Sequence, residues 1–215
     1  MFSFLSCILQ TALVFYSFRV APDRISDSFD WAGYDAVILE NAALSDNRVE
    51  ARSVYTKDSL YLDFRVSDSD LRAHQTQKDH PELFLDDMIE FLFDCKNDRT
   101  QKWAEDDIIY HVNILGQKKD DRGTALGESD PSWDGRARLS VKCYGTVNHS
   151  DDVDSWYEIF AAIPWKELGR KPRKGTELGF NFACGDNDGK GRCLFAWSPS
   201  DPIRNPGAFG ILKCK

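Results

Sequence analysis

The sequence predicts an all-β domain, an antiparallel jelly-roll-like β-sandwich. Apolar residues alternate with polar ones through most of the apolar segments, a pattern typical of strands with one buried face. Turn-rich loops such as DDRGTALGESDPS separate these segments, and we see no linker or repeat between them. At 215 residues the chain is large enough to form a single core without a metal or a disulfide.

Eight or nine strands account for the alternating segments. The clearest is SLYLDFRVSDSD, in which every second residue from Leu60 to Val66 is apolar. The other segments are residues 87–94, 107–115, 136–147, 155–163, 177–184, 192–197 and 209–214. One short helix is expected over PWKELG, because Pro164 suits a helix start and Gly169 a helix end.

The stretch PELFLDDMIEFLFD places four acids among apolar residues. Alternation puts Glu90 and Asp94 on the face opposite Phe91 and Phe93, whereas Asp87 falls on the apolar side or at the start of the strand. A catalytic pair is disfavoured, because residues four apart lie about 13 Å apart along a strand, beyond the ~5 to 9.5 Å used by glycosidases. We therefore expect Glu90 to contact a ligand, with Asp94 as its solvated neighbour.

Charge and missing motifs exclude several classes of function. The net charge of -8 disfavours nucleic acid and anionic membranes as partners and favours a neutral or cationic ligand. The sequence also lacks a G-x-S-x-G nucleophile elbow, a phosphate-binding glycine loop and the Cys/His spacing of zinc sites.

Residues 1–20 are predicted to be a signal peptide or N-terminal apolar segment, with the domain proper at residues 21–215. The apolar run from Phe2 to Phe18 is too short and too interrupted for a transmembrane span. A signal peptide implies a secreted, periplasmic or cell-surface protein, although no positive charge precedes Arg19. The alternative is a buried first strand.

Cys184 and Cys193 flank GDNDGKGR, which reads as the tip of a β-hairpin. Cysteines on either side of such a tip are candidate disulfide partners. The alternative is two buried thiols in a reducing compartment.

Glu90, His111 and Asn113 are expected to face the same way on adjacent strands, with Phe84 just before them. Sugars are held by this mixture, because an aromatic ring packs on the apolar face of the sugar while carboxylate and amide groups bind its hydroxyls. The alternative is an ordinary solvated sheet face. In the polar loops, Trp133 is a further candidate for a sugar-facing ring.

Three stretches, taken in order, resemble the family 9 carbohydrate-binding modules: LFLDDMIEFLFD, SWYEIFAAIPWKELG and GFNFACGDNDGKGRCLFAWSPSDPIRNPGAFGIL. The resemblance runs from about Asp23 to the C-terminus. It implies an immunoglobulin-like or DOMON-like β-sandwich that binds glycans without catalysis and can accompany a glycoside hydrolase. In well-studied members two tryptophans hold the reducing-end sugar, and bound calcium supports the structure.

Carried over by position, the resemblance makes Glu90 the sugar-binding glutamate and Phe84 the first aromatic wall. His111 stands where the family can carry an arginine. The short loop SPSDPIRNPGA lacks the second tryptophan, and Ile203 or Pro202 stands near its place. We therefore expect a monomer that binds its glycan weakly.

Asp86 and Asp87 are candidate calcium ligands, because they offer adjacent hard oxygens. Two other functions stay open. The sandwich also resembles haem-binding electron-transfer domains, for which Met88 and His111 would be the axial ligands. A glycoside hydrolase is the second alternative.

Overall fold

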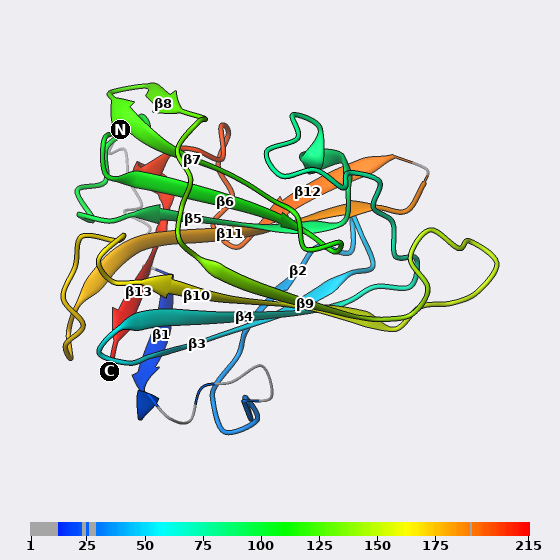
Figure 1. Cartoon of the computed structure of the whole chain (residues 1–215), viewed down its shortest axis with the longest axis horizontal. Coiled ribbons are helices and arrows are strands. Elements are labelled where there is room, and N and C mark those ends of the chain that lie inside the picture. The colour runs from blue at the N-terminus through cyan, green and yellow to red at the C-terminus, as the bar shows by residue number, and fades with distance from the viewer. Residues whose placement is uncertain (1–12, 23–24, 26–28, 190) are drawn as a thin grey trace, which may run out of the picture.

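Two β-sheets pack face to face in the computed structural model, which describes residues 13–22, 25, 29–189 and 191–215 (Figure 1). The first sheet runs in the order β8 (Glu128–Asp130), β7 (Lys118–Ala125), β6 (Asp107–Asn113), β5 (Met88–Asp94), β11 (Glu177–Asn187) and β13 (Gly210–Cys214), with β12 (Arg192–Ala196) also paired to β11. The second runs β9 (Arg138–Tyr144), β10 (Trp156–Pro164), β4 (Ser59–Ser67) and β3 (Arg48–Tyr55), with β2 (Val37–Glu40) on β3. The predicted sandwich is confirmed.

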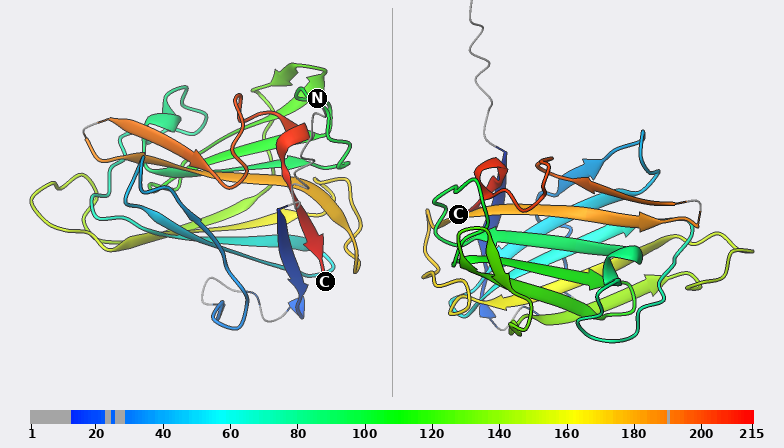
Figure 2. Two further views of the ribbon diagram at one scale, coloured as in Figure 1. Left: turned by 180° about the vertical axis from the view of Figure 1, so that it is seen from behind. Right: turned by 90° about the horizontal axis from the view of Figure 1, so that it is seen from above.

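Strand β1 (Val14–Arg19) joins the two sheets at one end of the sandwich (Figure 2). Its first part pairs with β13 and its last two residues pair with β3, both in parallel. Phe15 is buried, and its ring centroid lies 5.5 Å from that of Phe180. Residues 14–19, which fall within the segment predicted to be a signal peptide or an N-terminal apolar segment, form this first strand, with Phe15 and Ser17 buried. Residues 1–12 lie outside the described part of the chain, and cleavage of the N-terminus stays a prediction.

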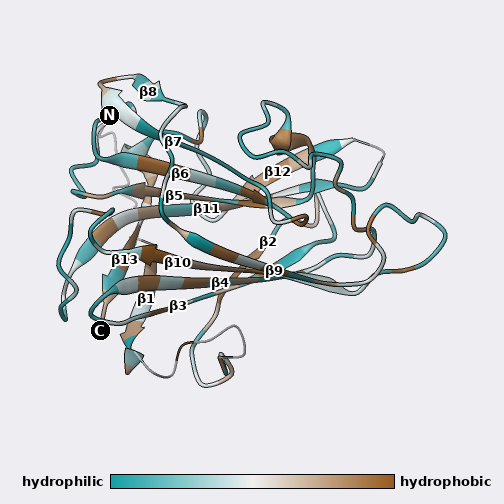
Figure 3. Ribbon diagram, in the orientation of Figure 1, coloured by the Kyte–Doolittle hydropathy of each residue, from teal (hydrophilic) through white to brown (hydrophobic). Residues whose placement is uncertain are grey.

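Aromatic rings dominate the core between the sheets. The ring of Phe91 on β5 lies 5.8 Å from that of Phe64 on β4 and 5.1 Å from that of Tyr110 on β6. Phe182 on β11 completes the contact, 5.4 Å from Phe64. Such rings bury large apolar areas and interlock, so they hold the two sheets in one relative position. Figure 3 shows the resulting alternation of hydrophobic and hydrophilic residues along the strands.

The structure contains strands that the apolar pattern does not reveal. Residues 120–132, predicted to be a loop, contribute most of β7 and all of β8. Strand β7 reads KKDDRGTA, and its two aspartates are buried through ion pairs: Lys118 Nζ lies 2.8 Å from Asp120, and Arg204 Nη2 lies 2.6 Å from Asp121. Charge pairing replaces apolar alternation in this strand, so hydropathy alone misses it.

The predicted helix over residues 164–169 is wrong. Pro164 is the last residue of β10, and residues 165–169 form the turn that follows, in which Glu167 N donates to Pro164 O at 2.9 Å. Gly169 has a φ of +62°, so the residue expected to end the helix does end the turn. Within the described ranges the labelled helical elements are two short 3-10 turns, η2 (Leu83–Leu85) and η3 (Pro206–Ala208), and none is long or apolar enough to cross a membrane.

The predicted disulfide between Cys184 and Cys193 is also wrong. The β11–β12 register pairs Cys184 with Phe195 and Cys193 with Asp186, so the two cysteines are not opposite each other. All five cysteines in the described part of the chain are free. The Cys184 thiol is buried next to the Tyr157 hydroxyl, 3.6 Å away, as the buried-thiol alternative expects.

Asp63 is a buried carboxylate on the outer face of the second sheet. It is 2% exposed, and its Oδ1 has no hydrogen-bond partner among the described residues. Burial raises the pKa of Asp63 to about 8, and the nearby Glu158 carboxylate adds to the rise. An aspartate in an unfolded chain has a pKa of about 3.9. Its contribution to stability is therefore complete below that value and is lost as the pH rises through about 8.

Replacing this group with a neutral isostere tests the assignment. We expect Asp63→Asn to gain stability relative to the parent as the pH rises, by up to about 1.4 kcal/mol per pH unit until the pH reaches the folded-state pKa. Urea unfolding at a series of pH values measures the difference. The exposed Asp151→Asn is the control and should show no such trend. A difference between Asp63→Asn and the parent that does not change with pH would contradict the assignment.

Candidate functional site

The outer face of β5 carries a buried glutamate. In register, Glu90 lies between His111 on β6 and Ala183 on β11, and it is 3% exposed. Its Oε1 lies 3.1 Å from His111 Nδ1, whereas its Oε2 has no hydrogen-bond partner among the described residues. A buried carboxylate oxygen without a donor is costly and rare in folded proteins. The Glu90 carboxylate therefore keeps one acceptor oxygen that the described residues do not use.

Nearby basic side chains keep Glu90 ionised. Burial by itself would raise the pKa of Glu90, and the neighbouring His111 acts against that effect. Arg192 and Arg204 act in the same direction, and together these groups hold the pKa of Glu90 below its ordinary value. The carboxylate can thus accept hydrogen bonds throughout the neutral pH range.

Two arginines at this site escaped the sequence prediction. The guanidinium of Arg192 lies 5.2 Å from the centroid of the Phe84 ring. That of Arg204 lies 5.3 Å from the Trp103 ring centroid and is paired with Asp121 on β7. The sequence could have indicated Arg204, because it directly follows Ile203 in the loop where the family resemblance places the second aromatic wall. Arg192 gives no comparable signal, because only the β11–β12 hairpin brings it to the site.

Phe84 forms an exposed aromatic surface beside the site. It lies in η2, directly before β5, and is 40% exposed. Its neighbour Leu83 is fully buried and anchors the turn. Figure 3 shows η2 as a hydrophobic element among hydrophilic loops. An aromatic ring held this way can pack against the apolar face of a ligand ring.

Ile203 lies on the same side of the first sheet as Glu90. It packs against an apolar cluster in which Trp103 and Phe209 cover Leu92 and Ile109. In Figure 1 the β12–β13 loop that carries Ile203 rises on the side of the sheet that also carries η2. Phe84, Glu90, His111 and Ile203 thus lie at one face of the first sheet.

Asp94 does not fit its prediction as a solvated neighbour of Glu90. It is fully buried and accepts hydrogen bonds from the backbone N–H groups of Asp98 and Arg99, at 3.2 and 2.8 Å. The loop after β5 folds back over the strand end and uses this carboxylate as its anchor. Asp94 is therefore a structural residue.

Asn113 points to the predicted face, but its side chain forms hydrogen bonds with other residues of the protein. It is fully buried, and its amide donates to Gln75 O and to Asp86 Oδ2, both at 2.8 Å. Its oxygen accepts from Gln117 N at 2.8 Å. These bonds leave the side chain no free donor for a ligand, so we assign it to the support of the site.

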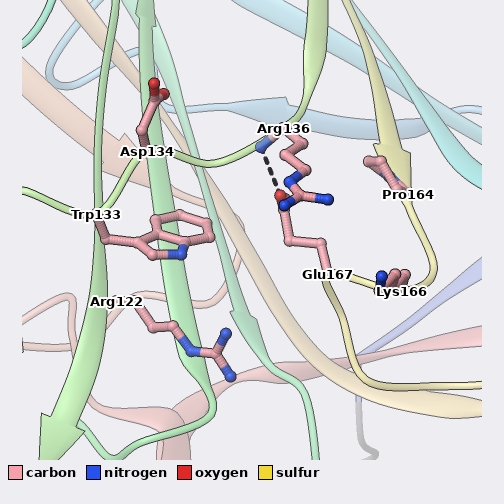
Figure 4. A pocket seen from close by; sticks show the side chains of 7 residues that line it. All are labelled: Arg122, Trp133, Asp134, Arg136, Pro164, Lys166 and Glu167. Atoms are coloured by element: carbon pink, nitrogen blue, oxygen red, sulfur yellow. Dashed lines mark hydrogen bonds between the residues drawn. The ribbon is translucent and has the colours of Figure 1, made fainter.

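Trp133 is not brought to the Glu90 site. Its ring packs against Tyr110, with centroids 5.8 Å apart. Tyr110 belongs to the core-facing side of β6, whereas its neighbour His111 faces Glu90. Trp133 instead borders a separate pocket (Figure 4).

The predicted metal pair is split by the structure. Both oxygens of Asp86 accept hydrogen bonds, from His74 N, Gln75 N and Asn113 Nδ2. Asp87 instead joins Asp68 and Asp186, and their carboxylate oxygens lie within 4.8 Å of one another. Oxygens that share one calcium ion at about 2.4 Å cannot be farther apart than this, so the three acids fit such an ion, and Asp86 is not part of their group.

Burial, together with the charges of neighbouring acids, raises the pKa values of Asp87 and Asp68. Burial raises the pKa of Asp87 to about 9, and the charge of Asp68 contributes. Burial also raises the pKa of Asp68 to about 6. Carboxylates crowded in this way repel one another when ionised, and a divalent cation removes that repulsion.

The geometry does not support the haem-binding alternative. Met88 is fully buried, and its side chain packs on Gly185, where an added Cβ would lie 3.0 Å from Met88 Cγ. His111 faces Glu90. Both predicted axial ligands are thus engaged within the protein.

Fold and site together define a β-sandwich binding domain, with an ionised acceptor, cations and an exposed aromatic ring on one sheet face. Comparison with known proteins makes this specific. The chain belongs to the family described as carbohydrate family 9 binding domain-like, whose profile matches residues 21–215. It is a binding module by family, and the resemblance seen in its motifs is confirmed.

Curated relatives are much longer enzymes. Endo-1,4-beta-xylanase A of Thermotoga neapolitana is 27% identical over 168 residues, which cover 76% of this chain and 14% of that protein. Exoglucanase XynX of Acetivibrio thermocellus is 25% identical over 198 residues, covering 91% of this chain and 16% of that protein. The chain thus corresponds to a small part of each.

Solved structures share the fold. A family 9 carbohydrate-binding module from Caldicellulosiruptor kristjanssonii in complex with cellotriose has a TM-score of 0.71 at 23% identity, covering 94% of both chains. The module from the same organism in complex with glucose has a TM-score of 0.68 at 23% identity, covering 94% of this chain and 96% of that one.

Proposed function

We propose that the face formed by Phe84, Glu90, His111 and Ile203 binds one end of a β-linked oligosaccharide without catalysing a reaction. The observation that carries this proposal is the unpaired, buried Oε2 of Glu90. A sugar hydroxyl supplies the missing donor, and the exposed Phe84 ring receives the apolar face of the sugar. His111 and the two arginines keep the acceptor charged.

The ligand class follows from the relatives. Structures of the family hold cellotriose and glucose, and the curated relatives are xylanases and an exoglucanase. We infer a glucose- or xylose-based oligosaccharide, bound by its reducing end, and a role beside a glycoside hydrolase in polysaccharide catabolism. Phe84 is the single exposed stacking wall on this face among the described residues, so weak binding in the millimolar range is expected, corresponding to about -4 kcal/mol.

Glu90→Gln and Phe84→Ala test this site. The first replaces a charged acceptor, so we expect about tenfold weaker binding or more, as for hydrogen bonds to charged groups. The second removes the stacking wall and should weaken binding without changing stability greatly, because Phe84 is exposed. Calorimetry or NMR titration with cellotriose and xylotriose measures both, and borohydride-reduced cellotriose tests the reducing-end preference.

Tyr144→Ala is the matched control. Tyr144 is an exposed aromatic residue on β9 of the second sheet, so its loss should leave sugar affinity unchanged. Equal affinities of the parent and Glu90→Gln would refute the role of Glu90. If the parent binds no oligosaccharide in a glycan array, the ligand proposal fails as a whole.

A calcium ion held by Asp68, Asp87 and Asp186 is the second part of the proposal. The three acids are buried and belong to different segments. Asp68 and Asp186 also line an acidic pocket of about 200 Å³. Asp87 also accepts the backbone N–H groups of Arg72 and Asn187, at 2.6 and 2.7 Å. An ion here would tie the start of β5 to the β4 end and the β11 hairpin, and would stabilise the loop next to Phe84.

Calcium addition should raise the melting temperature of the protein relative to a chelator. A site saturated about 100-fold over its Kd adds about 2.7 kcal/mol. For a domain of this size that is a shift of roughly 5 to 10 °C. Asp186→Asn should lose most of the shift, whereas Asp151→Asn removes an exposed charge elsewhere and should keep it. No shift in the parent would contradict the calcium site.

Export to the cell surface or periplasm stays a prediction, as does the monomeric state. For β1 to remain in the mature protein, a signal peptidase would have to cut before Val14. Mass spectrometry of the secreted protein would give that position.

A further inference from the structure

A second pocket lies at one end of the sandwich, separate from the Glu90 face. Its volume is about 350 Å³, within the range of about 300 to 1,000 Å³ typical of small-ligand sites. Arg122 comes from β7, Trp133 and Arg136 from the β8–β9 loop, and Lys166 and Glu167 from the turn after β10 (Figure 4). We refer to the pocket that these five residues line, with Asp134 and Pro164 also at its wall, as the Trp133 pocket.

The pocket's two acids are already occupied by the protein. Asp134, at its rim, is paired with Lys78 and Lys118, each with its Nζ 2.7 Å from a carboxylate oxygen. Figure 4 shows Asp134 directed away from the other lining side chains. Glu167 accepts hydrogen bonds from the Tyr110 hydroxyl and from the Arg136 backbone N–H. Neither acid has a carboxylate oxygen left without a partner.

The cationic side chains of the pocket, in contrast, can still form hydrogen bonds and ion pairs with a ligand. In the part of the chain that the structure describes, the Arg136 guanidinium and the Lys166 ammonium have no hydrogen-bond or ion-pair partner. Arg122 uses only its Nε, which donates to Glu105 O at 3.1 Å. The pocket therefore presents unpaired positive charge, although the whole protein carries a net charge of -8.

An aromatic wall stands beside these cations. Trp133 is half-buried, and its position is held by the Tyr110 ring on the core side. Figure 4 places the indole across the pocket from Arg136 and Glu167. A ligand that suits this arrangement has a ring with an apolar face for the indole and a carboxylate for the arginines, which bind carboxylates in a bidentate manner.

We propose that the Trp133 pocket is a second glycan-binding site, specific for a sugar that bears a carboxylate, a uronic acid residue. Tyr110 and His111 are consecutive on β6, and their side chains face opposite sides of the sheet. The two sites can therefore hold two different parts of one branched chain, or two chains. This goes beyond the neutral-sugar function of the Glu90 face, and either site can fail in an experiment without the other.

A titration of ¹⁵N-labelled protein with methyl β-D-glucuronide tests the proposal. The methyl group blocks the reducing end, so the probe does not report on the Glu90 face. We expect a saturable shift of the Trp133 indole N–H, assigned by its loss in Trp133→Phe. Methyl β-D-glucoside, which lacks the carboxylate, and acetate, which lacks the ring, should each give no saturable shift. Added salt should weaken glucuronide binding.

Variants assign the binding to the pocket. Arg136→Gln should bind the glucuronide about tenfold more weakly, as expected for loss of a charged hydrogen-bond donor. Because Arg136 is exposed, this variant should fold normally. Glu90→Gln should bind it like the parent. The proposal is overturned if the parent shows no saturable shift, if the glucoside or acetate shifts the indole equally, or if Arg136→Gln binds unchanged.

Discussion

Strand β5 is the constraint on which the rest of the molecule depends. It is paired on both sides, by β6 and β11, and all of its residues are buried. Its core-facing Phe91 packs on Phe64 of the opposite sheet and so links the two sheets, and it also stacks on Tyr110 of the neighbouring strand. Because strand side chains alternate strictly, the same packing determines that Glu90 points to the opposite face, and a one-residue slip would exchange the two.

Burial of that opposite face gives Glu90 its properties. Loops after β5 and β12 cover Leu92 with Trp103 and Phe209, so the carboxylate lies at the edge of a dry surface rather than in bulk water. Water competes poorly there, and each charged hydrogen bond to a ligand is worth more than it would be on an exposed strand. The nearby cations offset the cost of burying the charge.

Alternation of residue types was enough to predict the sandwich and the orientation of Glu90, His111 and Phe91. It could not predict β7, whose buried aspartates depend on Lys118 and on Arg204 from a distant loop. It also misjudged Asp94, because alternation indicates the face of a residue but not what covers that face. The grouping of Asp87 with Asp68 and Asp186 depends on three segments meeting in space, for which the sequence carries no local signal.

The central claim is that the unpaired oxygen of Glu90 receives a sugar hydroxyl. A crystal structure of the protein with bound cellotriose tests it most directly. The account predicts a hydroxyl oxygen about 2.5 to 3.0 Å from Glu90 Oε2, with the sugar ring against Phe84. A sugar bound elsewhere, with Oε2 still lacking a donor, would contradict it.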